Sequence, residues 1–157
     1  MNLMYFGSST SEKSIGAVNR IVVEKSKRVM TLYNNLEVIK IYRIALGFSP
    51  QGHKEKQGDG KTPEGQYKIC GKNPNSRFHK SLRVSYPSSK DIECAKKNCI
   101  ADPGNDIMVH GLGRGFSWLG KTHLLKDWTL GCIALTNEEI DEIYDAVKVG
   151  ATIEIKP

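Results

Sequence analysis

No stretch of this 157-residue chain approaches the roughly 20 consecutive apolar residues that a membrane-spanning helix needs, so no membrane span is predicted. The opening segment, Met1–Phe6, lacks the positive charge and the apolar length of a signal peptide. The sequence as written is therefore expected to be either a trimmed form or a cytosolic protein.

Runs of Lys and Arg interleaved with aromatic residues are also missing, and the net charge of +6 is moderate. Nucleic-acid binding is therefore not expected. A positive charge suits any anionic polymer, a bacterial cell wall included, and charge alone does not choose between such partners.

Cysteine is scarce, with four residues at Cys70, Cys94, Cys99 and Cys132. If Cys132 is a nucleophile, three remain, and an odd number is not a disulfide framework. Cys94 and Cys99 lack the two-residue spacing of zinc motifs, and no second ligand pair follows, so neither a metal nor a cofactor is predicted. On a helix these two Cα atoms would lie roughly 8 Å apart, too far for a disulfide, so we expect free thiols.

Length and composition are those of one ordinary globular domain, with 39% hydrophobic and 25% charged residues. Residues 1–16 are patternless and are predicted to be a flexible tail, and residues 17–157 the folded domain. The pair Asn34-Asn35 suits a two-residue type I′ turn within a β-hairpin. Alternating or β-branched segments predict strands at residues 20–24, 28–33, 36–46, 66–70, 81–86, 107–110 and 151–155.

Two helices are predicted from their end signals. The first spans residues 89–99, with Ser88 or Ser89 as N-cap. The second begins at Thr136, which a glutamate follows three residues later as in a capping box, and should end at Gly150. Many short strands with a few helices predict a mainly β (α+β) domain of sandwich-like or barrel-like form.

The segment Asp106–Thr136 carries the reactive residues. His110-Gly111 ends one short apolar strand, and Gly131-Cys132 precedes another. A nucleophilic cysteine needs a base within hydrogen-bond reach and backbone N–H groups that face the developing oxyanion, and these two strands can supply both. A neighbouring imidazole should also favour the thiolate at lower pH than in a free cysteine. The alternative is a buried structural cysteine beside an unrelated histidine.

Two motifs, in this order, resemble the L,D-transpeptidase (YkuD-type) catalytic domain. One is the turn Thr62-Pro63-Glu64-Gly65, and the other pairs His110-Gly111 with the run from Thr129 to Leu135. The resemblance implies that Cys132 is the acylated nucleophile and His110 its base. It further implies that the carbonyl of Gly111 orients the imidazole, and that the N–H groups of Gly131 and Cys132 form the oxyanion hole.

The resemblance also implies a peptidoglycan stem peptide as substrate and a periplasmic or cell-wall-associated location. Leu130 and Ala134 stand where many members have polar residues, and the segment 113–127 is a long active-site loop. These features look closer to a branch that includes stem-peptide hydrolases, so transfer to an amine and transfer to water both stay open. A non-catalytic wall-binding module is the alternative from another class.

Three residues of the long loop are candidates for substrate binding. Arg114 and Lys121 could pair with substrate carboxylates, or could simply be solvated charges. Trp118 is expected to form a wall of the cleft on a flexible lid, and the other tryptophan, Trp128, to pin the loop or to line the cleft. His123 is a weaker candidate for the same cleft.

Overall fold

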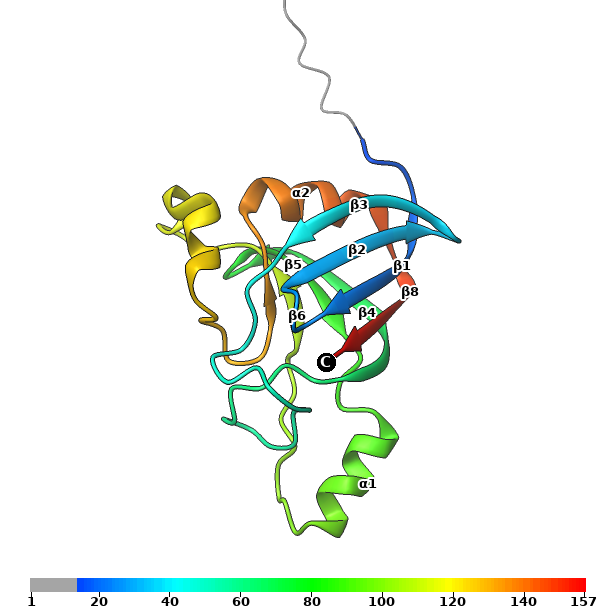
Figure 1. The fold of residues 1–157 in the computed structure, drawn as a ribbon, viewed down its shortest axis with the longest axis vertical. Helices are drawn as coiled ribbons and strands as arrows, with labels where there is room; N and C mark the ends of the chain where they lie inside the picture. Colours follow the sequence, from blue (N-terminus) through cyan, green and yellow to red (C-terminus); the bar gives the residue numbers. More distant parts are fainter. Residues whose placement is uncertain (1–13) are drawn as a thin grey trace, which may run out of the picture.

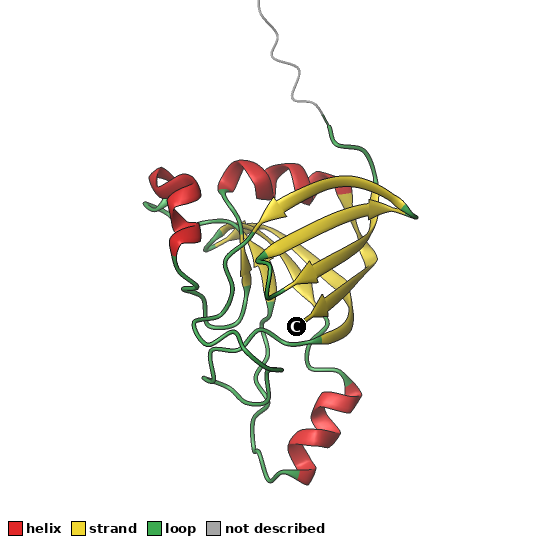
Figure 2. Ribbon diagram, viewed as in Figure 1, coloured by secondary structure: helices red, strands yellow, loops and turns green. Residues whose placement is uncertain are grey.

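The computed structural model describes residues 14–157, which are organised around one curled β-sheet (Figures 1 and 2). Within the described residues the strand order is β3-β2-β1-β8-β4-β5-β6-β7. The strands are β1 (Val18–Glu24), β2 (Val29–Asn34), β3 (Glu37–Arg43), β4 (Gly65–Ser76), β5 (His79–Val84), β6 (Met108–His110), β7 (Ile133–Ala134) and β8 (Val147–Lys156). The helices are α1 (Ser89–Lys97), the 3₁₀ helix η1 (Ser117–Leu125) and α2 (Asn137–Ala146).

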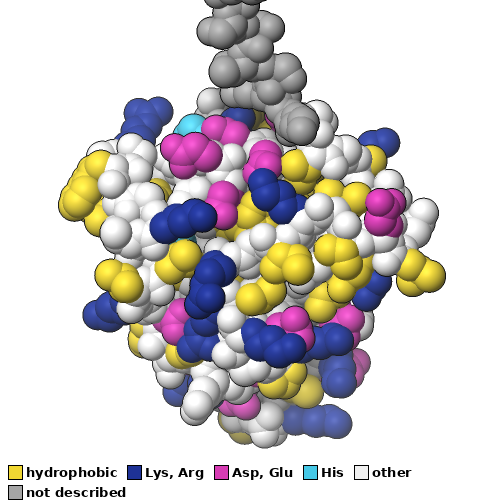
Figure 3. Space-filling model, turned by 45° about the horizontal axis from the view of Figure 1, so that its top comes forward, with side chains coloured by type: hydrophobic (Ala, Val, Ile, Leu, Met, Phe, Trp, Pro, Cys, Tyr) yellow, Lys and Arg dark blue, Asp and Glu magenta, His cyan; other side chains and the backbone are white. Residues whose placement is uncertain are grey.

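This architecture confirms the predicted mainly β domain with a few helices. The predicted tail, residues 1–16, lies mostly outside the described residues. None of the helices in the described part of the chain is long and apolar enough to cross a membrane. On the face that Figure 3 shows, Lys and Arg side chains are interspersed with acidic and hydrophobic ones.

The core fills the inside of the curled sheet, and α2 packs against it with Ile140 and Ile143 fully buried. In β8, residues Ala151, Ile153 and Ile155 alternate inward, as the two-residue period of a strand requires. Each fully buried aliphatic side chain contributes about 1.5–3 kcal/mol relative to exposure. Helix α1 instead lies away from the sheet, at the bottom of Figure 1.

The hairpin turn lies one residue beyond its predicted position. Asn34 pairs with Glu37, so Asn35 and Leu36 form the turn, and of these two only Asn35 has a positive φ (+56°). A type I′ turn requires a positive φ at both central residues, so the predicted turn type is wrong. Asn19 of β1 fixes the register, because its side-chain oxygen accepts the N–H of Asn35 at 2.9 Å.

Helix α1 confirms the predicted Ser88 cap, and its capping box is completed by Asp91. The helix ends at Lys97 instead of reaching Cys99, which has a φ of +55°. All four cysteines are free, as expected.

Helix α2 begins at the predicted capping box of Thr136 and Glu139, but the predicted end at Gly150 is wrong. The helix ends at Ala146, and Val147 already pairs with Val18 of β1. The helix ends before the glycine because residues from Val147 onward join the sheet as β8. There the backbone N–H and C=O groups of β8 form hydrogen bonds with strands on both sides.

The segment 113–127, predicted as a long loop, is partly helical. It contains η1, whose helical turns are interrupted at Gly120 by a φ of +48°. The two glycines at 115 and 120 hid these short turns, since neither supports a helical period.

Candidate active site

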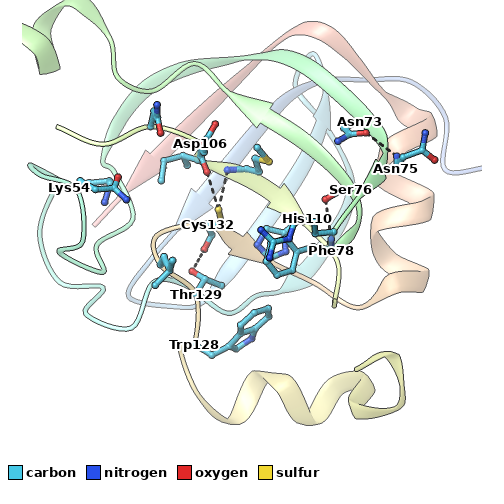
Figure 4. Close-up of a pocket in the computed structure, with 16 residues that line it drawn as sticks. Lys54, Asn73, Asn75, Ser76, Phe78, Asp106, His110, Trp128, Thr129 and Cys132 are labelled. Atoms are coloured by element: carbon cyan, nitrogen blue, oxygen red, sulfur yellow. Dashed lines mark hydrogen bonds between the residues drawn. The ribbon is translucent and has the colours of Figure 1, made fainter. Parts of the chain in front are cut away.

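Strands β6 and β7 bring the two sequence motifs together. They pair in parallel, with His110 opposite Ala134 and Val109 opposite Ile133. His110 therefore ends one strand and Cys132 precedes the other. Both side chains line one cavity of about 540 Å³ (Figure 4).

His110 is only 2% exposed, and its ring is fixed on several sides. Its Nδ1 lies 2.6 Å from the carbonyl oxygen of Gly111. A carbonyl can only accept, so Nδ1 carries the proton and Nε2 presents a lone pair. Phe78 stacks on the ring at a centroid distance of 4.3 Å, and Trp128 packs edge-on at 5.9 Å.

Burial lowers the pKa of His110 to about 4, although the hydrogen bond to Gly111 acts in the opposite direction. The imidazole is therefore neutral at neutral pH. A neutral ring with a free Nε2 lone pair is a competent proton acceptor.

Cys132 faces backbone groups. Its sulfur lies 3.3 Å from the carbonyl oxygen of Asp106, to which the thiol donates, and 3.4 Å from the N–H of Met108, which donates to the sulfur. Within residues 14–157 no hydrogen bond joins this sulfur to His110.

Burial raises the pKa of the Cys132 thiol, against the lowering effect of the Met108 N–H group. In this geometry burial therefore opposes the expected thiolate, and the comparison with His110→Ala stays a prediction. Desolvation disfavours the charged form of both side chains, so the resting pair is a neutral thiol and a neutral imidazole.

The turn before Cys132 is clamped by Thr129. The Thr129 hydroxyl donates to the carbonyl of Cys132 at 2.7 Å and accepts the N–H of Gly131 at 3.1 Å. Of the two N–H groups predicted to form the oxyanion hole, that of Gly131 is thus engaged, whereas that of Cys132 has no acceptor among the described residues. An oxyanion role for the Gly131 N–H stays a prediction, and it requires this bond to open.

Both glycines beside the reactive residues stand where a side chain would collide with its surroundings. Gly131 has a φ of +143°, and a Cβ there would lie 2.7 Å from the carbonyl oxygen of Lys61. A Cβ on Gly111 would lie 2.6 Å from Asn137 Oδ1. Close approach of a backbone carbonyl therefore explains Gly131, and crowding by the Asn137 side chain explains Gly111.

The Thr-Pro-Glu-Gly turn follows Lys61, whose carbonyl oxygen lies against Gly131. The hydroxyl of Thr62 accepts the N–H of Gly47 at 3.1 Å, and its carbonyl accepts from the buried ammonium of Lys25 at 2.7 Å. Lys25 also pairs with Glu64 at 3.2 Å. The two motifs thus belong to one structural unit, in which Lys61 packs against Gly131.

The cavity has polar side chains that the sequence did not single out. Figure 4 places Lys54 on one side of Cys132, and Asn73 and Asn75 on the other, beyond His110. The nearest signal was the Asn73-Pro74-Asn75 run, which is unusual within a strand. Within the described residues, no cluster of three or more His, Cys, Asp or Glu side chains could hold a metal ion.

The structure does not bring the predicted substrate-binding residues to this cavity. Arg114 lines a neighbouring hollow with Ser76, Trp118 is 76% exposed, and Lys121 is exposed. Trp128 lines the cavity instead, and its indole N–H donates to Nδ1 of His123 at 3.3 Å. A substrate role for the three loop residues stays a prediction.

The two positions that depart from the family pattern also differ from each other. Leu130 lines the cavity and is exposed. Ala134 is fully buried and pairs with Ala45 through both backbone groups, so it does not line the cavity.

Fold and cavity together define a small, curled β-sheet domain with a cysteine and a histidine in one pocket. Residues 18–155 match the family model of the L,D-transpeptidase catalytic domain (YkuD), and the chain therefore belongs to that family. This confirms the resemblance seen in the two motifs.

A curated relative is YafK of Escherichia coli strain K12, which is provisionally named an L,D-transpeptidase. The two sequences are 27% identical over 152 residues, and the match covers 93% of this chain and 53% of YafK. The chain thus spans about half the length of that relative. Among solved structures, the helical cell shape determining protein Pgp2 of Campylobacter jejuni has a TM-score of 0.67 and 23% identity, covering 93% of this chain and 52% of Pgp2. An L,D-transpeptidase from Mycobacterium smegmatis has a TM-score of 0.59 and 18% identity, covering 90% of this chain and 60% of its own. These two likenesses support the fold.

Proposed function

We propose that the protein is a cysteine-dependent acyltransferase that acts on peptidoglycan stem peptides. Nε2 of His110 takes the thiol proton of Cys132, and the sulfur attacks a peptide carbonyl that follows a diamino acid centre. The tetrahedral intermediate collapses as its C–N bond breaks, and Nε2 returns the proton to the leaving amine. A thioester on Cys132 remains.

One observation carries this proposal: the sulfur of Cys132 lines the same cavity as an imidazole whose Nδ1 is fixed on Gly111. The fixed tautomer leaves Nε2 as proton acceptor and later as proton donor. The N–H of Cys132, which has no acceptor among the described residues, would bind the oxyanion. Family membership supplies the substrate class.

The thioester then passes either to an amine, which gives a crosslink or an attached protein, or to water, which gives trimming by a carboxypeptidase or amidase. The exposed, apolar Leu130 on the rim offers no hydrogen bond to an incoming amine. We therefore propose that transfer to water is at least as fast as crosslinking. Family membership also supports a periplasmic or cell-wall-associated site of action.

The test is incubation of the protein with defined muropeptides, followed by mass spectrometry of products and of the intact protein. We expect a single acyl adduct on Cys132, loss of a terminal residue from tetrapeptides, and neither in a folded Cys132→Ala variant. Cys70→Ala is the matched control, since this thiol is exposed and lies outside the cavity. Turnover by Cys132→Ala at the wild-type rate would refute the cysteine mechanism.

The same experiment separates the enzyme from a non-catalytic wall-binding module. A module would retain muropeptides without altering their mass, and its Cys132 would show no acyl adduct. A carbapenem should likewise acylate the protein once, at Cys132, and peptide mapping would detect an adduct elsewhere.

A further inference from the structure

The side chain of Lys54 carries a buried ammonium group, and the proposed acyl transfer assigns no role to it. The residue lies in the Gly-rich segment 47–61, whose composition predicts solvated charge, yet it is only 2% exposed. Its Nζ donates to Asp59 Oδ1 at 2.8 Å and to the carbonyl of Lys56 at 3.2 Å. An ammonium has three N–H groups, and in the described chain only these two acceptors meet it.

Asp59 holds Lys54 in place. Its carboxylate accepts the backbone N–H groups of Glu55, Lys56 and Lys61 at 2.9–3.1 Å. Burial by itself would raise the pKa of Asp59, but the hydrogen bonds from Lys54 and the backbone lower it to about 2. The carboxylate is thus a fixed anion with several donors, and it accepts one N–H of Lys54 while the carbonyl of Lys56 accepts a second.

Lys54 lines the same cavity as Cys132, and its charge reaches the thiol, whose pKa it lowers against the larger effect of burial. The other carboxylate on this side of the cavity, Asp106, is exposed and pairs with Arg83 at 3.0 Å, so it does not neutralise Lys54. A buried ammonium group with one N–H group that lacks a protein acceptor, at the edge of a cavity, favours an anionic ligand.

The position of the proton donor determines which part of the substrate lies beside Lys54. His110 must return a proton to the leaving amine, so the leaving group lies on the imidazole side of the sulfur. Figure 4 shows Lys54 on the opposite side of Cys132 from His110. The acyl portion, which stays on the sulfur in the thioester, therefore extends toward Lys54.

We propose that Lys54 binds a free side-chain carboxylate on the acyl-donor residue, and so selects stem peptides whose diamino acid is acidic over those in which this carboxylate is amidated. This inference rests on the proposed function and names the specificity of the same site. The third N–H of Lys54 donates to the substrate carboxylate, while Asp59 and Lys56 keep the other two.

The test compares two synthetic stem tetrapeptides that differ only in that group, one with the side-chain carboxylate and one with a carboxamide. The rate of thioester formation on Cys132 is followed by quench and intact-mass spectrometry. The wild type should prefer the carboxylate at least about tenfold, since a charged hydrogen bond contributes more than a neutral one. A wild-type ratio near one overturns the proposal without any variant.

The double variant Lys54→Met with Asp59→Asn removes both charges, so it leaves no unpaired ion, and it should abolish the preference. The matched control is Lys25→Met with Glu64→Gln, a second buried lysine pair, which does not line the cavity. The control should keep the preference even if it lowers stability. An unchanged ratio in the Lys54 double variant refutes this role, whereas absence of any thioester in the wild type refutes the proposed function itself.

Discussion

Lowering the pH from 7 to 5 should leave the acylation of Cys132 by its substrate nearly unchanged. Burial lowers the pKa of His110 from 6.5 to about 4. This corresponds to roughly 3 kcal/mol in favour of the neutral ring. About 90% of the imidazole would then be neutral at pH 5, against about 3% for a histidine of ordinary pKa.

The same burial makes folding depend on pH. Because the pKa of His110 is lower in the folded state than in the unfolded one, protonation favours the unfolded chain. Stability from this residue is complete above about pH 6.5 and is lost as the pH falls toward 4. Urea unfolding of the wild type and of His110→Gln at pH 7 and pH 5 measures this difference, which should shrink in the variant.

The assay is single-turnover acylation between pH 4 and 9, beside alkylation by iodoacetamide with the other three cysteines replaced by serine. The acylation rate should decline only near pH 4, and the alkylation rate should still be rising at pH 9.0, the ordinary thiol value, without a plateau. Two results would refute the reasoning. One is an acid limb near pH 6.5, and the other is an alkylation plateau at pH 6 that His110→Ala removes, which would reveal a thiolate–imidazolium pair.

Three further predictions concern the frame of the site. Gly131→Ala should destabilise the fold by about 2–3 kcal/mol in urea, because its Cβ would meet a carbonyl at 2.7 Å. Gly115→Ala, with a φ of +83° and nothing near its Cβ, should cost about 1 kcal/mol, and equal effects would contradict the packing argument. Trp128→Phe removes the indole N–H that donates to Nδ1 of His123 and should lower the free energy of unfolding in urea by about 1 kcal/mol, since a neutral hydrogen bond contributes about that much. Thiol counting under denaturing, non-reducing conditions should find Cys94 and Cys99 free, and a bridge between them would contradict the free thiols of the structure.

The sequence predicted correctly those helix starts that depend only on residues within one turn of the helix. Ser88 and Thr136 begin capping boxes that a sequence shows directly, and both helices start there. The same reasoning misplaced the end of α2, because Val147 is committed to β1, a partner more than a hundred residues away. The hairpin turn moved by one residue for a similar reason, since Asn19 on β1 holds Asn35.

That His110 and Cys132 lie in one cavity could be predicted, because each residue stands beside a glycine in a recognisable motif. The rest of the cavity was not, because its walls come from segments that only the sheet brings together. Lys54 has the sequence surroundings of a solvated charge, and its burial depends on Asp59 and on the packing of Gly104 against its side chain. The burial of His110, which lowers its pKa, was not predicted either, because it depends on Phe78 and Trp128 from other segments.

The position of β8 has a consequence for biosynthesis. This strand follows all the others in the sequence, yet it lies between β1 and β4 in the sheet. A growing chain can form the first hairpin early, but the two halves of the sheet present open edges until the ribosome has passed Lys156. A chain that stops before this point would lack the strand that joins the two halves of the sheet, and we expect such a product to be more susceptible to proteolysis.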